Sequence, residues 1–545
     1  MTKALFQLFP MAADPFPGSI PHAQPQDVPA YMSTAQQHKK NCRFPYAITF
    51  DSTLFRSMRS AMETVAGLPE LTPQCLEHII SHLEPRDALR VACAQKLWHG
   101  LVVNDEQLWK RHLVEELGIS DKQGVDGSIR RSSWDAYANW RQAFGAEYWP
   151  YLGRAVKAWS QIKAWLAANM PEILATLRPG LSEAEVVQVE AEMGLTLPPA
   201  LKVLHRLHDG QELYSDAALE RRIRNKLVLR ETGRGNVRME LEPEANVGPE
   251  AMARSIFCGL FGGYAVYDRR VVARMLPLRR AALWRIEMLR KLTQPLQRLS
   301  DGQDRLLPIA CSYNLYDKVL MADMDSGGLS VARLEPGQLE LWDAVPRADT
   351  RDGPLRWFEE YGRRLASGWY EAHSRGDVNN EGAKGTEAGV LDNQYSMLSR
   401  GISLFPMRPP GLVEAVTMGV QVRASVVFVP EYKVQDGHMF AYSIRFSLLE
   451  GWPLKRCQLM RRHWIIKPEP GRVETVQGEG VVGLFPILEP DRPEFVYCSC
   501  TRQTPTRGSM EGRFLFIPGS VERPEGPPFD VICPTFRLDV PDYIF

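Results

Sequence analysis

The stretch LPELTPQCLEHIISHLEPRDALRVACAQKLWHGLVVNDEQLWKRHLVEEL, residues 68–117, says more about fold and function than any other part of the chain. Its first apolar residues recur at the spacing of three and four that marks one face of a helix. They are Leu76, Ile79, Ile80 and Leu83. Pro85 interrupts this pattern, and two more short helices are predicted after it, the last capped by Asn104. Three short helices in about 50 residues are too few to bury a large core, so their apolar edge predicts a docking module.

This stretch resembles the F-box, which binds a Skp-type adaptor and so joins a cullin ubiquitin ligase. The positions that carry the resemblance are Leu68, Pro69, Ile79, Leu83, Asp87, Leu89, Trp98, Leu108 and Trp109. The resemblance implies an adaptor-binding set of six apolar residues, namely Leu68, Pro69, Ile79, Leu83, Leu89 and Trp109. The alternative is a small helical hairpin that belongs to a larger core.

The composition excludes several classes of partner. Sixty-five basic residues balance 65 acidic ones, which leaves no electrostatic footprint for nucleic acid or for an anionic membrane. No apolar run approaches the roughly 18–20 residues that a transmembrane helix needs, and no secretion signal is visible. The nine cysteines match neither a disulfide framework nor a zinc site. Reduced thiols in the cytoplasm or the nucleus are the simplest account.

The rest of the amino-terminal half divides by composition. Residues 1–50 are rich in Pro, Ala and Gln and are predicted to be a disordered leader before the F-box at 64–117. Residues 118–176 carry tryptophans among helix formers and are predicted to be linking helices. Residues 373–395 hold Gly, Asn, Asp and Ser with few apolar side chains, which predicts a flexible linker.

Residues 177–372 are predicted to form an α+β domain. Ser182 and Glu185 form a capping box, Gly194 can end that helix, and Pro198-Pro199 start the next one. Together with later strand-like segments and a closing helix at 354–372, this region resembles the SUKH domain, an α+β interaction fold. The charged insert at 220–250 is predicted to be a loop with poorly defined elements.

Residues 400–545 are predicted to form a β-sandwich. Phe440, Tyr442, Ile444 and Phe446 share one strand face, and Pro and Gly recur at intervals of roughly ten residues. The segments CQLMRRHWII, GEGVVGLFPIL, FVYCSC and VICPTFRL occur in the order of ApaG domains, which have a fibronectin-like sandwich. The predicted fold class is therefore multidomain α+β, with a trihelical F-box, an α+β SUKH domain and an all-β ApaG sandwich.

A glycine-rich motif in the last domain suggests a ligand. Residues 478–483 fit G-x-G-x-x-G, but β-like flanks argue against a dinucleotide fold. The resemblance to ApaG implies a possible phosphate site there, for which Arg461 and Arg462 could supply charge; a glycine-rich turn is the favoured alternative. The residues of this candidate ligand or partner surface are Arg461, Arg462, Gly478, Gly480, Gly483 and Trp452.

Other motifs are given structural readings, and we expect no catalytic residue, no metal and no cofactor. His78 and His82 have a metal-capable spacing but lack a third ligand, and Asp325-Ser326-Gly327-Gly328 reads as a β-turn. The loops predicted to face a protein partner are 431–438, 450–456 and 502–512. They contain Glu431, Tyr432, Trp452, Arg502, Arg507 and Met510.

The order F-box, SUKH, ApaG resembles the F-box-only-protein-three family, including its plant Skp-interacting members. This implies a substrate-recruiting subunit of a Skp–cullin–F-box ubiquitin ligase, with the adaptor, cullin and an unknown protein substrate as partners. The alternatives are a phosphorylated small-molecule-binding protein that acts through its ApaG domain, and an adaptor-bound scaffold without ligase activity. The sequence further predicts that the ApaG domain is structurally independent of the preceding part.

Overall fold

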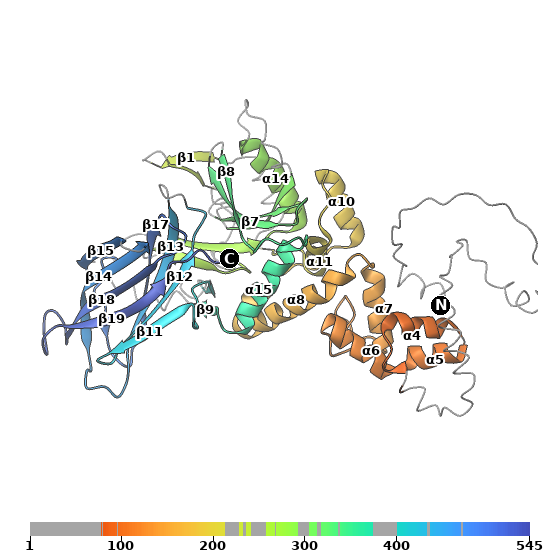
Figure 1. Ribbon diagram of the computed structural model, residues 1–545, viewed down its shortest axis with the longest axis horizontal. Helices are drawn as coiled ribbons and strands as arrows, with labels where there is room; N and C mark the ends of the chain where they lie inside the picture. Colours follow the sequence, from red (N-terminus) through yellow and green to blue (C-terminus); the bar gives the residue numbers. More distant parts are fainter. Residues whose placement is uncertain are drawn as a thin grey trace, which may run out of the picture. The chain divides into compact units, whose positions relative to one another are not determined.

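The structure is a computed structural model, and its described residues fall into two compact units divided between Ala146 and Glu147 (Figure 1). The described residues are 78, 80–94, 96–212, 228–232, 236–240, 258–267, 269–292, 305–312, 318–335, 338–373, 400–432, 437–469 and 472–545. The predicted leader and most of the predicted linker therefore lie outside them, as do Leu68, Pro69 and Ile79.

The first unit is helical. Its helices are α4 (Pro85–Ala94), α5 (Lys96–Asn104), α6 (Glu106–His112), a π-helical turn (Leu113–Leu117) and α7 (Ser133–Ala143). Pro85 does not end a helix but begins α4, where its missing N–H has no intrahelical partner to lose. Leu108 and Trp109 of α6 are buried, so this apolar pair forms part of the interior of the unit.

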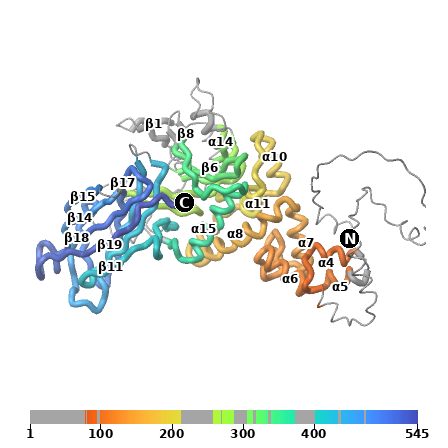
Figure 2. The backbone as a smooth tube through the Cα atoms, in the orientation of Figure 1, coloured from red at the N-terminus to blue at the C-terminus, as the bar shows by residue number. Residues whose placement is uncertain are grey.

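The second unit opens with helices that the sequence predicted. Ser182 forms the expected capping box with Glu185 at the start of α10, and Gly194 ends that helix with φ +65°. Helix α15 lies against α8, and both views show the two side by side (Figures 1 and 2). The helices of this unit are α8 (Trp149–Asn169), α9 (Pro171–Leu174), α10 (Glu183–Met193), α11 (Pro199–Leu207), α14 (Leu278–Leu292) and α15 (Gly353–Ala366).

An eight-stranded sheet accompanies these helices, in the order β8-β7-β6-β5-β4-β3-β10-β9. Its strands are β3 (Gly263–Val266), β4 (Arg269–Met275), β5 (Leu306–Ser312), β6 (Val319–Asp323), β7 (Leu329–Glu335), β8 (Gln338–Asp343), β9 (Glu371–His373) and β10 (Gly401–Ser403). Strand β10 follows the predicted linker, yet it pairs with β9 and, in parallel, with β3. The sheet thus includes residues from both sides of that linker.

Two segments of the charged insert at 220–250 are among the described residues, and both are strands. Strands β1 (Val228–Thr232) and β2 (Asn236–Glu240) form an antiparallel hairpin within it. The sequence predicted a loop with poorly defined elements here, and the structure identifies two of those elements as a strand pair.

The last part of the unit is an all-β sandwich, as predicted. One sheet has the order β11-β12-β13-β17, and the other has β15-β14-β18-β19 with β16 paired to β14. The strands are β11 (Leu412–Thr417), β12 (Val420–Phe428), β13 (His438–Leu448), β14 (Cys457–Glu469), β15 (Arg472–Glu479), β16 (Ile487–Leu488), β17 (Phe495–Gln503), β18 (Ser509–Pro518) and β19 (Phe529–Arg537). The four predicted core residues of β13, from Phe440 to Phe446, are at most 5% exposed. The mixed α+β fold class is confirmed.

The predicted independence of the sandwich is wrong. A core made of Tyr264, Val271, Phe405, Val429 and Ala441 joins the eight-stranded sheet to the sandwich. Figure 2 shows the blue carboxyl-terminal end of the tube returning to the green strands of the eight-stranded sheet. Composition revealed the polar linker at 373–395, but it could not reveal that apolar residues on both sides pack together.

A buried polar cluster reinforces this junction. The Lys318 ammonium lies 3.2 Å from a carboxylate oxygen of Glu431, and the Tyr264 hydroxyl donates to the same oxygen at 2.6 Å. Lys318 also donates to the backbone oxygen of Phe545 at 2.5 Å, and Trp357 Nε1 donates to the oxygen of Ile544 at 2.7 Å. Residues far apart in sequence therefore meet in one polar network between the sheet and the sandwich.

Candidate adaptor-binding and partner-binding surfaces

The helical module at 78–143 is built around a buried tryptophan. The Trp109 ring lies 4.6 Å from that of Trp134 and 5.0 Å from that of Tyr137, between ring centroids. Its indole Nε1 donates to the Val102 carbonyl at 2.7 Å, so the polar end of the ring is satisfied. Helices α5, α6 and α7 are held together through this one side chain.

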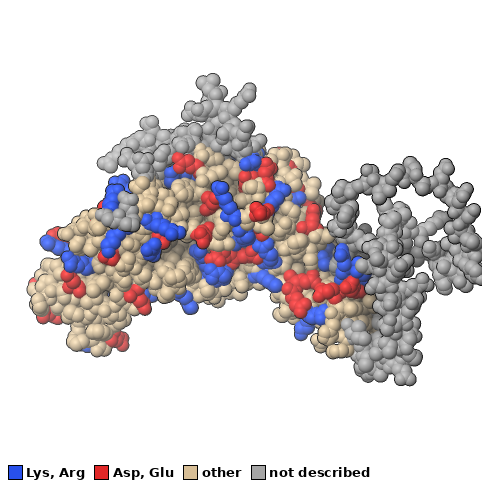
Figure 3. All heavy atoms as spheres, viewed as in Figure 1, with Lys and Arg blue, Asp and Glu red and all other residues tan. Residues whose placement is uncertain are grey.

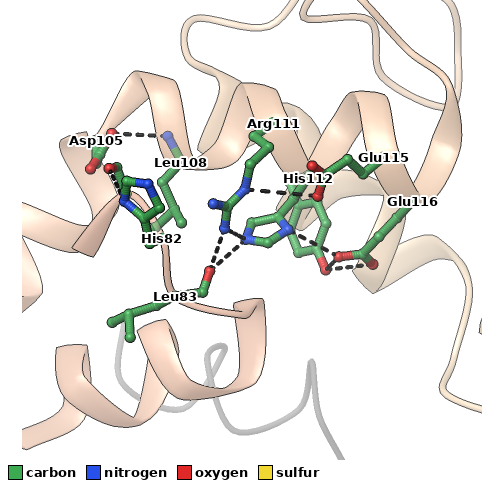
Figure 4. Close-up of polar contacts among 10 residues, drawn as sticks. His82, Leu83, Asp105, Leu108, Arg111, His112, Glu115 and Glu116 are labelled. Carbon is green, nitrogen blue, oxygen red and sulfur yellow. Dashed lines mark hydrogen bonds and ion pairs between the residues drawn. The ribbon is translucent and has the colours of Figure 1, made fainter. Parts of the chain in front are cut away.

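Helix α6 begins one residue later than predicted. Asp105, rather than Asn104, is the N-cap, and its carboxylate accepts a hydrogen bond from the Leu108 N–H at 2.9 Å (Figure 4). Both residue types cap helices well, so the sequence pattern alone could not separate two adjacent candidates.

Two side chains of α6 hold the segment before α4. The Leu83 carbonyl accepts from Arg111 Nη2 at 2.7 Å and from His112 Nε2 at 2.9 Å (Figure 4). The other ring nitrogen of His112 lies 3.4 Å from the Glu116 carboxylate, and the Arg111 guanidinium lies 3.8 Å from Glu115. These contacts orient the end of the first F-box segment on α6.

Carboxylates also tie α6 and the following turn to α7. The Tyr137 hydroxyl donates to Glu116 at 3.0 Å, and burial, followed by the nearby Glu116 charge, raises the pKa of Tyr137. At the start of α6, Glu106 accepts from the Ser133 hydroxyl at 2.9 Å and pairs with Lys122 at 2.7 Å. Desolvation opposes ionisation of Glu106, but the hydrogen bonds from Lys122 and Ser133 outweigh it and lower the pKa.

The described members of the predicted adaptor-binding set differ in accessibility. Leu83 is half-buried, whereas Leu89 and Trp109 are 5% and 0% exposed. In this chain the last two are interior residues, which can shape an adaptor surface from within but offer it little area. The other three members, including Ile79, lie outside the described residues.

The glycine-rich motif forms a turn after β15 and does not open a helix. Gly480 has φ +57°, and a Cβ atom there would lie 2.5 Å from the Leu484 carbonyl oxygen. Val481 and Leu484 exchange backbone hydrogen bonds of 2.9 Å, while Gly483 takes φ +76°. The backbone therefore requires glycine at these positions for conformational and steric reasons, which agrees with the interpretation of the motif as a glycine-rich turn.

The basic residues next to this turn are engaged by the turn itself. Arg462 Nη1 donates to the carbonyls of Gly480 at 2.8 Å and Glu479 at 3.2 Å, and its guanidinium lies over Gly478. Arg461 lies 3.4 Å from the Glu479 carboxylate in an exposed pair. An arginine that donates to turn carbonyls stabilises the turn, and an incoming phosphate would have to compete with those carbonyls.

Trp452 lies in the connection between β13 and β14. It is 41% exposed and packs on Gly419, where a Cβ atom would lie 2.8 Å from the Trp452 side chain. This contact places Trp452 at the turn between β11 and β12. It remains an accessible aromatic side chain at a sandwich turn.

Two loops predicted to face a partner instead contain buried residues. Glu431 belongs to the buried cluster with Lys318, and Met510 is 1% exposed within β18. Polarity suggested exposure for 431–438, but Arg333 binds the carbonyls of Pro430 and Tyr432 at 2.8 and 3.2 Å. These two residues are not available to a partner.

Charged side chains of both signs are interspersed on the face shown in Figure 3, in keeping with the neutral composition. Within the described ranges, no three His, Cys, Asp or Glu side chains are grouped to hold a metal ion. His78 and His82 contact each other, with 4.6 Å between ring centroids. Among the described helices, none is long and apolar enough to cross a bilayer.

Comparison with known proteins identifies the family. The family model for F-box-like domains matches residues 73–115, and that for the ApaG domain matches residues 430–518. F-box protein SKIP16 of Arabidopsis thaliana is 32% identical over 502 residues, which cover 88% of this chain and 100% of that protein. The chain belongs to the F-box protein family of SKIP16.

Two further relatives match all or part of the chain. F-box only protein 3 of Homo sapiens is 25% identical over 492 residues, covering 88% of this chain and 87% of that protein. Protein ApaG of Bdellovibrio bacteriovorus is 41% identical over 123 residues, covering 22% of this chain and 90% of that protein. The F-box and ApaG resemblances are thus confirmed, and the SUKH resemblance of residues 177–372 stays a prediction.

Sequence reasoning missed the structural role of the polar residues that organise this F-box protein. Arg111, His112 and Glu116 orient the F-box segments, and Lys318 with Glu431 occupies the junction of sheet and sandwich. Only the helical spacing of His112 and Glu116 gave a local signal, because residues four apart face each other on a helix. The others meet across long sequence separations.

Proposed function

We propose that this F-box protein is the substrate-recognition subunit of a Skp–cullin–F-box ubiquitin ligase. The observation that carries the proposal is the division of one chain between an F-box-like helical unit and a separate compact unit that contains the ApaG sandwich. The helical unit would bind a Skp-type adaptor and, through it, cullin. The second unit would hold a protein substrate.

Such a subunit works by proximity and needs no catalytic group of its own. Holding a substrate near the ubiquitin-loaded conjugating enzyme raises the effective concentration of the substrate at that enzyme. The buried junction between sheet and sandwich supports this role, because a rigid second unit presents any bound substrate in one orientation. The role places the protein in the cytoplasm, the nucleus or both.

Co-purification of the full chain with adaptor and cullin tests the proposal. Replacing Leu68 and Pro69 by alanine should abolish adaptor binding, because a few apolar anchors carry most of the energy of an interface, about 1–4 kcal/mol each. A matched control replaces Leu283 and Ile286 of α14 by alanine, since both are exposed apolar residues of the second unit. Adaptor binding that survives the first double substitution would contradict the proposed interface.

Ubiquitin transfer separates the proposed role from the scaffold alternative. The reconstituted complex should modify a captured substrate, and the Leu68/Pro69 variant should not. A chain that binds adaptor but never recruits cullin would be a scaffold. The small-molecule alternative gains no support from the geometry of the glycine-rich turn, where Arg462 donates to backbone carbonyls.

A further inference from the structure

Apart from β16, a two-residue strand that pairs with β14, the described part of the sandwich has four outer strands, and three of them lie against another strand. Strands β11 and β19 lie against each other, with Ile532 N–H donating to the Thr417 hydroxyl at 3.3 Å. Strand β17 lies against β3 of the eight-stranded sheet, and most of its residues between Phe495 and Gln503 are buried or half-buried. The remaining outer strand is β15.

Strand β15, residues Arg472–Glu479, has one open edge. Figure 1 shows it at the margin of the five-stranded sheet, and among the described strands only β14 pairs with it. Six of its eight residues are exposed, including Val473 at 59% and Val476 at 44%. Alternate N–H and C=O groups of such a strand point away from the sheet and can pair with another backbone.

The strand is protected toward its ends, by Arg472 and Glu479 and by a register shift against β14 between Ile466 and Glu469, but less so at its centre. Its sequence RVETVQGE contains neither Pro nor Lys, and the central residues Thr475, Val476 and Gln477 are uncharged. In natural proteins, Pro or Lys in an edge strand, or a loop that covers it, commonly prevents pairing with another chain. An uncharged open centre is what a docking edge requires.

We infer that the β15 edge is the site at which this F-box protein binds its substrate, as an added strand from an extended polypeptide segment. This inference rests on the proposed function and names the mode of recognition. An open ladder of N–H and C=O groups is matched by the backbone of an extended peptide, which supplies affinity, while alternate side chains supply specificity.

The side chains of β15 define the chemistry of that segment. Val476 and Glu474 share a face, since they pair with Trp464 and Ile466, which are both buried residues of β14. A strand added beside them would place an apolar residue next to Val476 and a basic residue, two positions away, next to Glu474. Arg472 pairs with Glu474 at 2.8 Å, but both side chains are largely exposed. A basic side chain of the added strand can therefore replace Arg472 as the partner of Glu474 at little cost in free energy.

The test uses a phage-displayed library of random dodecapeptides, selected on the full chain bound to its adaptor. The edge variant is Val476→Lys, which places a charge in the open centre. Val416→Lys is the matched control, because Val416 lies on the outer strand β11 and is also 44% exposed. Selected peptides should bind the edge variant at least about tenfold more weakly, and the control variant equally well.

Two further arms address the mode of binding. Methylation of alternate backbone nitrogens in the selected peptide should abolish binding, and bound peptide should slow hydrogen exchange in β15. Enriched peptides should carry a basic residue two positions from an apolar one. Peptides that bind the Val476→Lys variant equally well, tolerate the methylation, or are not enriched at all would overturn the inference.

The remaining outcomes separate this inference from the proposed function. A wild-type dimer that Val476→Lys converts to a monomer would make a second copy the occupant and would also overturn the inference. Intact adaptor and cullin binding with no edge-dependent peptide refutes the edge site alone. Edge-dependent peptide binding in a chain that never joins an adaptor refutes the ligase role and leaves the edge site standing.

Discussion

Removing the buried charge of Lys318 should destabilise residues 147–545 strongly. Lys318 and Glu431 side chains are each 1% exposed, and their charged atoms are 3.2 Å apart. Lys318→Met keeps the aliphatic stem but leaves the Glu431 carboxylate buried without its cation. Breaking a buried pair in this way costs about 3–5 kcal/mol of unfolding free energy.

Urea denaturation of the full chain, followed by hydrogen exchange in β5 and β13, measures this loss for the second unit separately. Adding Glu431→Gln should recover about 2 kcal/mol or more, because the amide removes the unpaired charge and still accepts from Tyr264. Lys467→Met is the control: Lys467 pairs with Glu511 at 2.7 Å, but the pair is exposed and should contribute at most about 1 kcal/mol.

Equal effects of Lys318→Met and Lys467→Met would refute the reasoning, since burial is the property that separates the two lysines. Recovery is equally decisive. If the Glu431→Gln substitution worsened the loss, the unpaired Glu431 charge could not be its cause. The buried pair would then play no part in joining the sheet to the sandwich.

Three other predictions concern His208, Trp109 and the glycine-rich turn. Burial, followed by the Lys163 charge, lowers the pKa of His208 from 6.5 to about 4. As the pH drops from 6.5 toward 4, the unfolded chain takes up this proton before the folded chain does, so the free energy of unfolding falls. His208→Gln should make that fall smaller, which urea denaturation at a series of pH values measures. Trp109→Ala should cost the helical module about 3–5 kcal/mol in thermal unfolding, whereas Val114→Ala, at 43% exposure, should change little. Calorimetry with simple nucleotides should show no saturable heat; a micromolar signal that Gly480→Val with Arg462→Ala removes would favour the ligand alternative instead.

Much of the fold was predictable because its signals are local. The capping box at Ser182, the left-handed Gly194 and the alternation from Phe440 to Phe446 each depend on residues within one helix or strand. The caps satisfy backbone groups at a helix end, and the alternation follows from strand geometry. Such features can be read without knowing which other parts of the chain they contact.

The functional surfaces were less predictable, because exposure depends on what covers a residue. Residues 431–438 looked like a partner loop, yet Glu431 is buried against Lys318. Trp109 matched the F-box pattern, but its place in the interior depends on Trp134 and Tyr137, more than 20 residues away. Polarity and motif position cannot supply that information.

By itself, the sequence determined the helical module, the capped helices and the sandwich, since short-range periodicity and residue order encode them, and its motifs resembled those of the family. Only the tertiary structure decided that the sandwich and the eight-stranded sheet form one unit, and that β15 is the outer strand left open. Both features depend on which strands pair or pack together and on which buried charges form ion pairs. Those pairings join residues more than 100 positions apart, as Lys318 and Glu431 are, through contacts that no local pattern records.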